Sequence, residues 1–151
     1  MRDTYNSPAE QEPLRRYLEN GDLDQGWRSG WFEQLAEWKR AGKRFHRVRL
    51  VSVPLTPYSK WGMLIAARSN EEGDDIRYLD RADAGALPDY DYWLFDSKLV
   101  AKMHFGDGDA FVSFELIEDP AVVVEHNYWR DAAWHHAVTR DEFAAEHGQQ
   151  R

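Results

Sequence analysis

The chain has 151 residues, of which 42% are apolar and 14% aromatic, and its formal net charge is −8. This length and composition predict one globular domain with a packed core, and they exclude a disordered chain. The acidic charge argues against nonspecific binding to nucleic acid or to an anionic membrane, because no counterion release would drive it. The sequence contains no cysteine, which excludes disulfide bonds and thiolate metal sites.

The first segment, residues 1–12, is polar and lacks the apolar stretch of a signal peptide. We expect this segment to be mobile, and we expect residues 13–148 to form a single α/β domain. No apolar run reaches the length of a transmembrane helix. The sequence therefore predicts a cytoplasmic protein that makes no contact with a membrane.

Capping residues and apolar faces predict five helices. They begin near Pro13, Ser29, Pro57, Pro120 and Thr139. Thr56 and Asp119 each stand before a proline, which is the order of an N-cap followed by proline at the first helical position. Thr139 is followed three residues later by Glu142, which predicts a capping box.

Five segments rich in β-branched and aromatic residues predict strands. They are Arg44–Val53, Ile76–Leu79, Tyr92–Phe95, Leu99–Phe105 and Phe111–Ile117. The first two flank a predicted helix, so we expect them to be parallel. The last three are joined by short turns and should be antiparallel neighbours. The expected fold is a two-layer α/β domain, with a mixed sheet of about five strands and helices packed on it.

Carboxylates form the first candidate site, at Asp89, Asp91 and Asp96. Oxygen ligands of this kind suit a hard divalent cation such as Mg²⁺. Aspartate is also favoured in turns for its backbone geometry, and we favour that interpretation here. Neither a metal nor another cofactor is expected.

Histidines and nucleophiles give weaker signals. His104 could meet Glu125 or His126 in a metal site with two or three ligands, although a surface or hydrogen-bonded histidine is the more common case. The sequence contains no His-Glu-x-x-His motif, nucleophile elbow or phosphate-binding glycine loop. We therefore assign no catalytic residue.

Arginines and aromatic residues supply a binding hypothesis. Arg47 and Arg49 share one face of a predicted strand, where they could bind an anion; pairing with the many carboxylates of the chain is the favoured alternative. Exposed aromatic side chains would anchor a partner or ligand, since Trp and Tyr dominate binding hot spots. The candidates are Trp27, Trp31, Trp61, Tyr90 and Trp93.

Several segments taken together resemble one actinobacterial family of unknown function, over residues 14–145. They are Phe45–Pro54, Leu55–Tyr58, Asp75–Leu79, Leu87–Phe105, the pair Asp119-Pro120, and Trp134. Members of that family occur near helix-turn-helix regulators of the WhiJ type and their small BldB-like partners. The resemblance implies a regulatory or partner-binding role.

The order of motifs from Leu87 to the last long helix is also similar to half of a phospholipase D-like domain. That superfamily uses a histidine, a lysine and an aspartate on one phosphodiester. On this frame Asp89, Asp91 and Asp96 take those three positions. An aspartate in place of the lysine reverses the charge that a phosphodiester needs, so the resemblance implies that the ancestral catalysis is lost.

Three functions follow as hypotheses. The first is a non-enzymatic regulatory or interaction module, either a partner of a helix-turn-helix transcription regulator or a small-ligand sensor. The second is a metal-assisted phosphodiesterase or nuclease that uses the three aspartates, with His104 as a further group. The third is an acidic mimic of nucleic acid.

Overall fold

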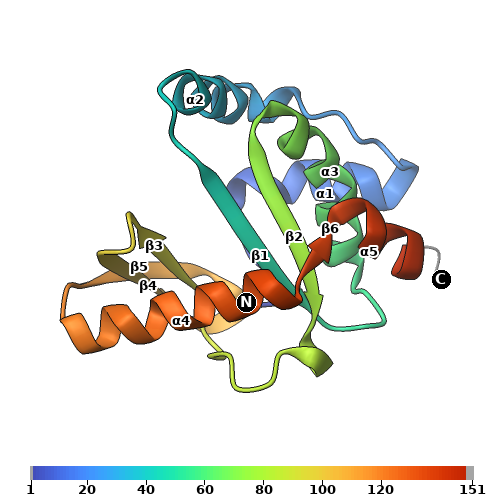
Figure 1. Cartoon of the computed structure of the whole chain (residues 1–151). Helices are drawn as coiled ribbons and strands as arrows, with labels where there is room; N and C mark the ends of the chain where they lie inside the picture. The colour runs from blue at the N-terminus through green and yellow to red at the C-terminus, as the bar shows by residue number, and fades with distance from the viewer. Residues whose placement is uncertain (1, 149–151) are drawn as a thin grey trace.

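The structure, a computed structural model, describes residues 2–148, which form five α-helices and two three-stranded sheets (Figure 1). The helices are α1 (Pro8–Asn20), α2 (Ser29–Arg40), α3 (Pro57–Glu72), α4 (Pro120–His136) and α5 (Arg140–His147). The strands are β1 (Phe45–Val51), β2 (Asp74–Asp80), β3 (Tyr92–Phe95), β4 (Leu99–Phe105), β5 (Phe111–Ile117) and β6 (Val138–Thr139). Three short 3₁₀ turns are η1 (Gly26–Arg28), η2 (Arg81–Asp83) and η3 (Asp107–Asp109).

The first sheet has the strand order β1-β2-β6. β1 and β2 are parallel, with Arg49 opposite Tyr78, and α3 makes the crossover between them. This confirms the predicted helix and parallel pair. Thr56 caps α3, because its side chain accepts a hydrogen bond from the backbone N–H of Ser59 at 3.1 Å.

The second sheet has the order β3-β4-β5 and is antiparallel throughout. Its three strands have the predicted bounds. Asp96 and Ser97 make the β3–β4 turn with φ angles of 49° and 58°, a backbone region that aspartate tolerates better than most residues. The pairing of β4 with β5 shifts register after His104, so that Val112 is an extra residue in β5.

The α/β class is confirmed, but the strands form two sheets instead of the single mixed sheet that we expected. β1 is an edge strand of the first sheet. Its Phe45 ring stacks on the Trp93 ring of β3, with the ring centres 5.3 Å apart. Side-chain packing therefore joins the sheets where a single sheet would have backbone hydrogen bonds.

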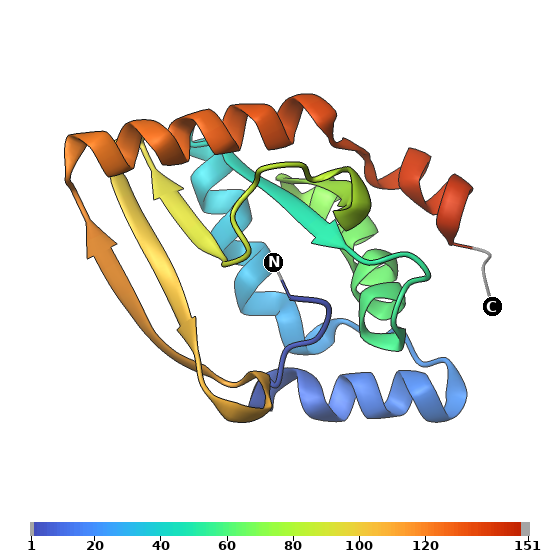
Figure 2. The same cartoon turned by 90° about the horizontal axis from the view of Figure 1, so that it is seen from below.

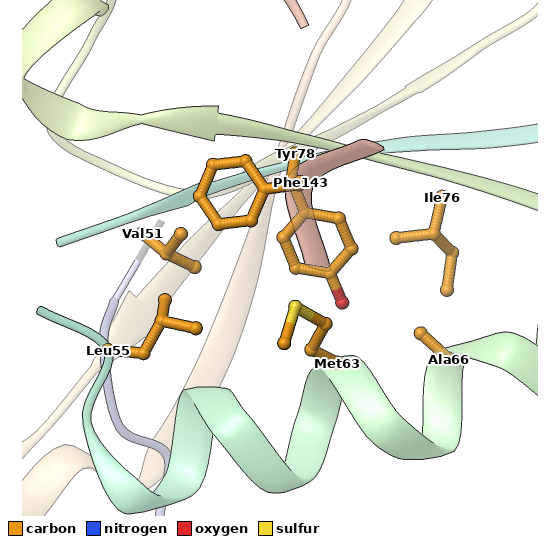
Figure 3. Packing of buried hydrophobic residues seen from close by; sticks show 7 residues of the cluster. All are labelled: Val51, Leu55, Met63, Ala66, Ile76, Tyr78 and Phe143. Carbon is orange, nitrogen blue, oxygen red and sulfur yellow. The ribbon is translucent and has the colours of Figure 1, made fainter. Parts of the chain in front are cut away.

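The main core lies between the first sheet and the helices α3 and α5 (Figure 3). Tyr78 of β2 stacks on Phe143 of α5 at 5.4 Å, and both side chains are almost completely buried. Met63 and Ala66 of α3 close this core from the other side. A smaller cluster around Leu50 and Leu79 lies on the opposite face of the sheet.

Two segments connect the sheets. α4 runs along one side of the molecule and contacts both β2 and β4 (Figure 2). The first helix begins at Pro8, five residues before the predicted start. Residues 2–7, which belong to the segment that we expected to be mobile, hydrogen-bond to both halves, for instance through Asp3 to Ser52 and through Thr4 to Asp109.

No helix within residues 2–148 combines the length and the apolar character needed to cross a membrane.

Candidate functional site

Two of the three aspartates of the predicted acidic site, Asp89 and Asp91, line one surface cavity, and Asp96 is not part of that lining. Asp89 is exposed, and Asp96 lies in the exposed β3–β4 turn. Asp91 is half-buried and accepts a hydrogen bond from the hydroxyl of Tyr5. Within residues 2–148, no three His, Asp or Glu side chains come close enough together to hold a metal ion.

A surface cavity of about 260 Å³ gathers several of the other predicted residues. Its lining includes Asp89, Tyr90, Asp91 and His104 together with the cations Arg2 and Lys102. The Lys102 ammonium lies 4.1 Å from the centre of the Tyr90 ring. Cations therefore accompany the two carboxylates, and the cavity is below the usual size of a small-molecule site.

The candidate metal ligands His104, Glu125 and His126 have other partners or stand apart. His126 is 3% exposed. Its Nδ1 lies 2.7 Å from the carbonyl of Val122, and since a carbonyl can only accept, Nδ1 carries the proton. Nε2 then accepts from the Tyr90 hydroxyl at 2.9 Å. His104 pairs with Glu115 at 2.9 Å, and Glu125 is exposed.

Three arginines, Arg28, Arg47 and Arg49, lie near one another, and Tyr5 acts on Arg49. The alternation of β1 directs Arg47 and Arg49 to the same face of the first sheet, and η1 brings Arg28 beside them. Arg28 is held in place by hydrogen bonds to the Ser69 hydroxyl at 2.7 Å and to the Ile65 carbonyl at 3.3 Å. The charges of Arg47 and Arg49 act on Arg28.

Arg47 has a carboxylate partner. Its guanidinium donates to both oxygens of Asp74, with Nε 3.3 Å from Oδ1. The Asp74 side chain has no exposed surface, and that of Arg47 is 19% exposed. Burial raises the pKa of the Asp74 carboxyl even beside this cation. The favoured prediction, pairing with a carboxylate, is thus confirmed for Arg47.

Arg49 is different. It is half-buried, and within residues 2–148 no hydrogen bond or ion pair joins its guanidinium to another side chain. Burial acts to lower its pKa, but the electrostatic influence of Tyr78, Tyr58, Tyr5 and Glu10 outweighs burial and raises it. Nη1 lies so close to α3 that a Cβ at Gly62 would be 3.2 Å away, so the glycine makes room for this cation.

Aromatic rings surround the arginines. Trp27 stacks on Trp61 at 6.0 Å, Trp61 contacts Tyr58 at 5.8 Å, and Tyr58 contacts Tyr5 at 5.8 Å. Arg47 lies 5.9 Å from the Trp31 ring centre. The indole N–H groups of Trp27 and Trp31 are buried and have no hydrogen-bond acceptor among the described residues. The polar groups of this region that lack a partner within residues 2–148, which include these indole N–H groups and the Arg49 guanidinium, are thus mainly hydrogen-bond donors.

We call this group the arginine–aromatic cluster. It consists of Arg28, Arg47 and Arg49 with Tyr5, Trp27, Trp31, Tyr58 and Trp61. Three carboxylates lie at its edges: Asp74 pairs with Arg47, Glu10 accepts from Tyr58, and Asp91 accepts from Tyr5. Burial and then the repulsion from Arg47 and Arg49 lower the pKa of Arg28 to about 10. The three guanidinium groups thus repel one another in a chain whose net charge is −8.

The cluster contains three of the five predicted aromatic anchors, Trp27, Trp31 and Trp61. Trp61 is only 1% exposed, so it supports the cluster from within the protein. The other two lie elsewhere: Trp93 stacks on Phe45, and Tyr90 lies beside His126.

Four members or neighbours of the cluster carry no local signal in the sequence: Tyr5, Glu10, Arg28 and Tyr58. They come from the first segment, α1, η1 and α3, which are distant in sequence from β1. The alternation of Arg47 and Arg49 was the one local signal that indicated the site.

Comparison with known proteins gives one match. The family model described as domain of unknown function DUF6879 matches residues 1–145. No curated protein and no solved structure matches the chain. Because the family model spans nearly all of the sequence, the chain belongs to this family, the domain of unknown function DUF6879.

Proposed function

We propose that this chain is a non-enzymatic ligand sensor, and that its ligand is a small carboxylate or phosphate compound with a flat apolar part. The observation that carries the proposal is Arg49, a half-buried guanidinium with no hydrogen-bond partner within residues 2–148. Leaving a buried or half-buried charged donor unpaired is costly, so an acceptor from outside the chain would stabilise it.

The neighbours of Arg49 favour an anion. Carboxylate and phosphate oxygens can accept two parallel hydrogen bonds from one guanidinium. The indole N–H groups of Trp27 and Trp31 have no acceptor among residues 2–148 but are buried, so they could donate to the anion only after their rings turn toward it. A negative charge at this point would reduce the repulsion that Arg47 and Arg49 exert on Arg28.

The aromatic rings favour a ligand with a flat apolar part. Trp27, Trp31 and Tyr58 present ring faces and edges beside the cations, and such surfaces pack against planar groups. Small-molecule sites usually combine a few polar groups with aromatic side chains, as this cluster does.

The regulatory part of the proposal is that a cytoplasmic helix-turn-helix regulator responds to this ligand through the chain. It is supported by the family resemblance described above and by the acidic charge of −8, which complements a basic DNA-binding partner.

The test uses the full chain and three anions: inorganic phosphate, benzoate and adenosine monophosphate. Titration calorimetry and thermal unfolding should show binding and a higher Tm with at least one of the two ring-containing anions. R49Q should weaken that binding about ten- to hundredfold, because a hydrogen bond to a charged group is lost. W31F, which replaces the indole by a smaller aromatic ring without an N–H, should weaken it less.

The matched control is R130Q. Arg130 is an arginine of α4 that bonds Ser97 and Asp131 far from the cluster, and its replacement should leave binding unchanged. Circular dichroism would establish that R49Q is folded. The proposal fails if none of the anions binds the wild-type chain, or if R49Q binds as tightly as R130Q.

A further inference from the structure

Strand β5 has an open edge. It is the last strand of the second sheet, hydrogen-bonded to β4 on one side, and no strand among residues 2–148 pairs with its other side (Figure 2). An open edge presents a row of backbone N–H and C=O groups that can pair with another strand.

The side chains of β5 are exposed along almost its whole length. Val112 is 64% exposed, Phe114 49% and Leu116 67%. The bulge at Val112 also brings the Phe111 ring against the Phe114 ring at 4.7 Å. The strand thus combines an open backbone edge with an apolar surface, a combination that marks interaction sites.

Lysine and proline, which commonly protect edge strands, are missing from β5, although a bulge, another such feature, lies at Val112. Segment 111–117 contains no lysine, arginine or proline, and its one charged residue is Glu115. That carboxylate is already paired with His104 of the neighbouring strand.

We propose that β5 pairs antiparallel with β5 of a second copy of this chain, around a two-fold axis at Phe114, so that the two antiparallel sheets become one. This register places Phe114 opposite itself and brings Leu116 to the bulged Val112 of the other copy, while the bulge keeps Phe111 on the same face as Phe114. The exposed apolar residues Val112, Phe114 and Leu116 of one copy thus meet those of the other, which is the self-complementarity that a two-fold interface requires.

Charge selects this register among its neighbours. With the axis at Phe114, Glu115 lies opposite Ser113. An axis at Glu115 would put two carboxylates directly opposite each other, which is unfavourable. An axis at Ser113 would pair Glu115 with Phe111 and Ile117 with Asp109, and Asp109 is already bonded to Arg2 and Thr4.

The experiment measures the oligomeric state of the full chain by sedimentation equilibrium from micromolar to millimolar concentration. The wild-type chain should be a dimer at the upper end. V112K and L116E should each shift it to monomer, because each places a charge opposite an apolar side chain. The double variant should recover the dimer, since the new ammonium then lies opposite the new carboxylate of the other copy.

V124K is the matched control, because Val124 is an equally exposed valine that lies on α4 and not on β5; it should leave the dimer intact. A second readout uses the absence of cysteine from the sequence. F114C should form a disulfide-linked dimer on mild oxidation, whereas V124C should not.

Two results would overturn the proposal: a wild-type chain that stays monomeric over the whole range, or a dimer that V112K and L116E leave unchanged. The proposal does not depend on the arginine–aromatic cluster, so anion binding and dimer formation can fail separately.

Discussion

Asp3 holds the N-terminal segment against the end of β1. Its carboxylate accepts hydrogen bonds from the backbone N–H and the hydroxyl of Ser52, both at 2.7 Å. Arg81 lies 3.5 Å from the same carboxylate. Burial opposes the charge of Asp3, but the Ser52 hydrogen bonds and the Arg81 charge outweigh burial, and the pKa of Asp3 is lowered below 3.8.

D3N should destabilise the protein. The amide keeps the shape of the side chain but removes the charge, so the hydrogen bonds from Ser52 weaken and Arg81 loses an anion. We expect a loss of about 1–3 kcal/mol in the free energy of unfolding at neutral pH, measured by urea denaturation. D107N changes an exposed aspartate in η3 and should have a much smaller effect.

The difference in the free energy of unfolding between wild type and D3N should become smaller as pH falls. A carboxyl with a lowered folded pKa stabilises the native state above its unfolded pKa and loses that contribution as pH falls through the folded value. The difference in the free energy of unfolding should therefore be largest above about pH 4 and should disappear below it. A difference that stays constant from neutral to acidic pH would show that the charge of Asp3 does not contribute.

At the scale of elements, local signals define where α5 begins. Thr139 accepts a hydrogen bond from the backbone N–H of Glu142 at 3.3 Å, and the Glu142 carboxylate accepts from the backbone N–H of Thr139 at 2.9 Å. This is the capping box that the sequence predicts, and it is confirmed. The hydrogen bonds from Thr139 lower the pKa of Glu142. They direct α5 so that Phe143 reaches the core beside Tyr78.

T139A should cost about 1 kcal/mol of stability, because it removes the side-chain acceptor at the N-cap. Thermal unfolding followed by circular dichroism would measure the loss. T139S keeps the acceptor and should remain close to wild type. If T139A and T139S unfold at the same temperature, the cap does not stabilise α5.

Other elements show the same rule. Thr56 and Asp119 cap α3 and α4 as their positions before proline predict. The pair Asp96-Ser97 makes the turn between β3 and β4. In each case the responsible contacts lie within a few residues of one another, so they can be read from the sequence.

At the scale of the whole molecule, residues 2–7 link the two sheets. Asp3 bonds Ser52 at the end of β1, while Arg2, Thr4 and Asn6 all bond Asp109 at the turn before β5. Together with α4, this segment spans the junction between the halves (Figure 2).

A chain that begins at Ser7 should therefore lose protection from hydrogen exchange at both ends of the link. We expect faster exchange around Ser52 and in the turn at 107–109, together with a lower urea midpoint. Exchange in the core at Tyr78 should change only as much as global stability does, since these amides open with the whole fold. Unchanged exchange at both ends would support the expected mobile segment instead.

The tertiary structure decided the division into two sheets. The five predicted strands are present, and β1 and β2 are parallel as expected, but the short β6 of the first sheet was not predicted. Yet the contact between Phe45 and Trp93, 48 positions apart, is one of rings and not of backbones. Local patterns do not distinguish those two ways of joining strands, because both place an aromatic residue on a buried face.

The sequence by itself determined which segments form the five helices, five of the six strands and the turns between the antiparallel strands, because caps, prolines and alternation act over a few residues. It also determined that Arg47 and Arg49 share a face. Only the tertiary structure decided that Arg47 has a carboxylate and Arg49 has none. That difference depends on which distant elements pack around each guanidinium: β2 brings Asp74 to Arg47, whereas α3 and the first segment bring Tyr58 and Tyr5 to Arg49. Long-range packing of this kind leaves no local pattern in the sequence.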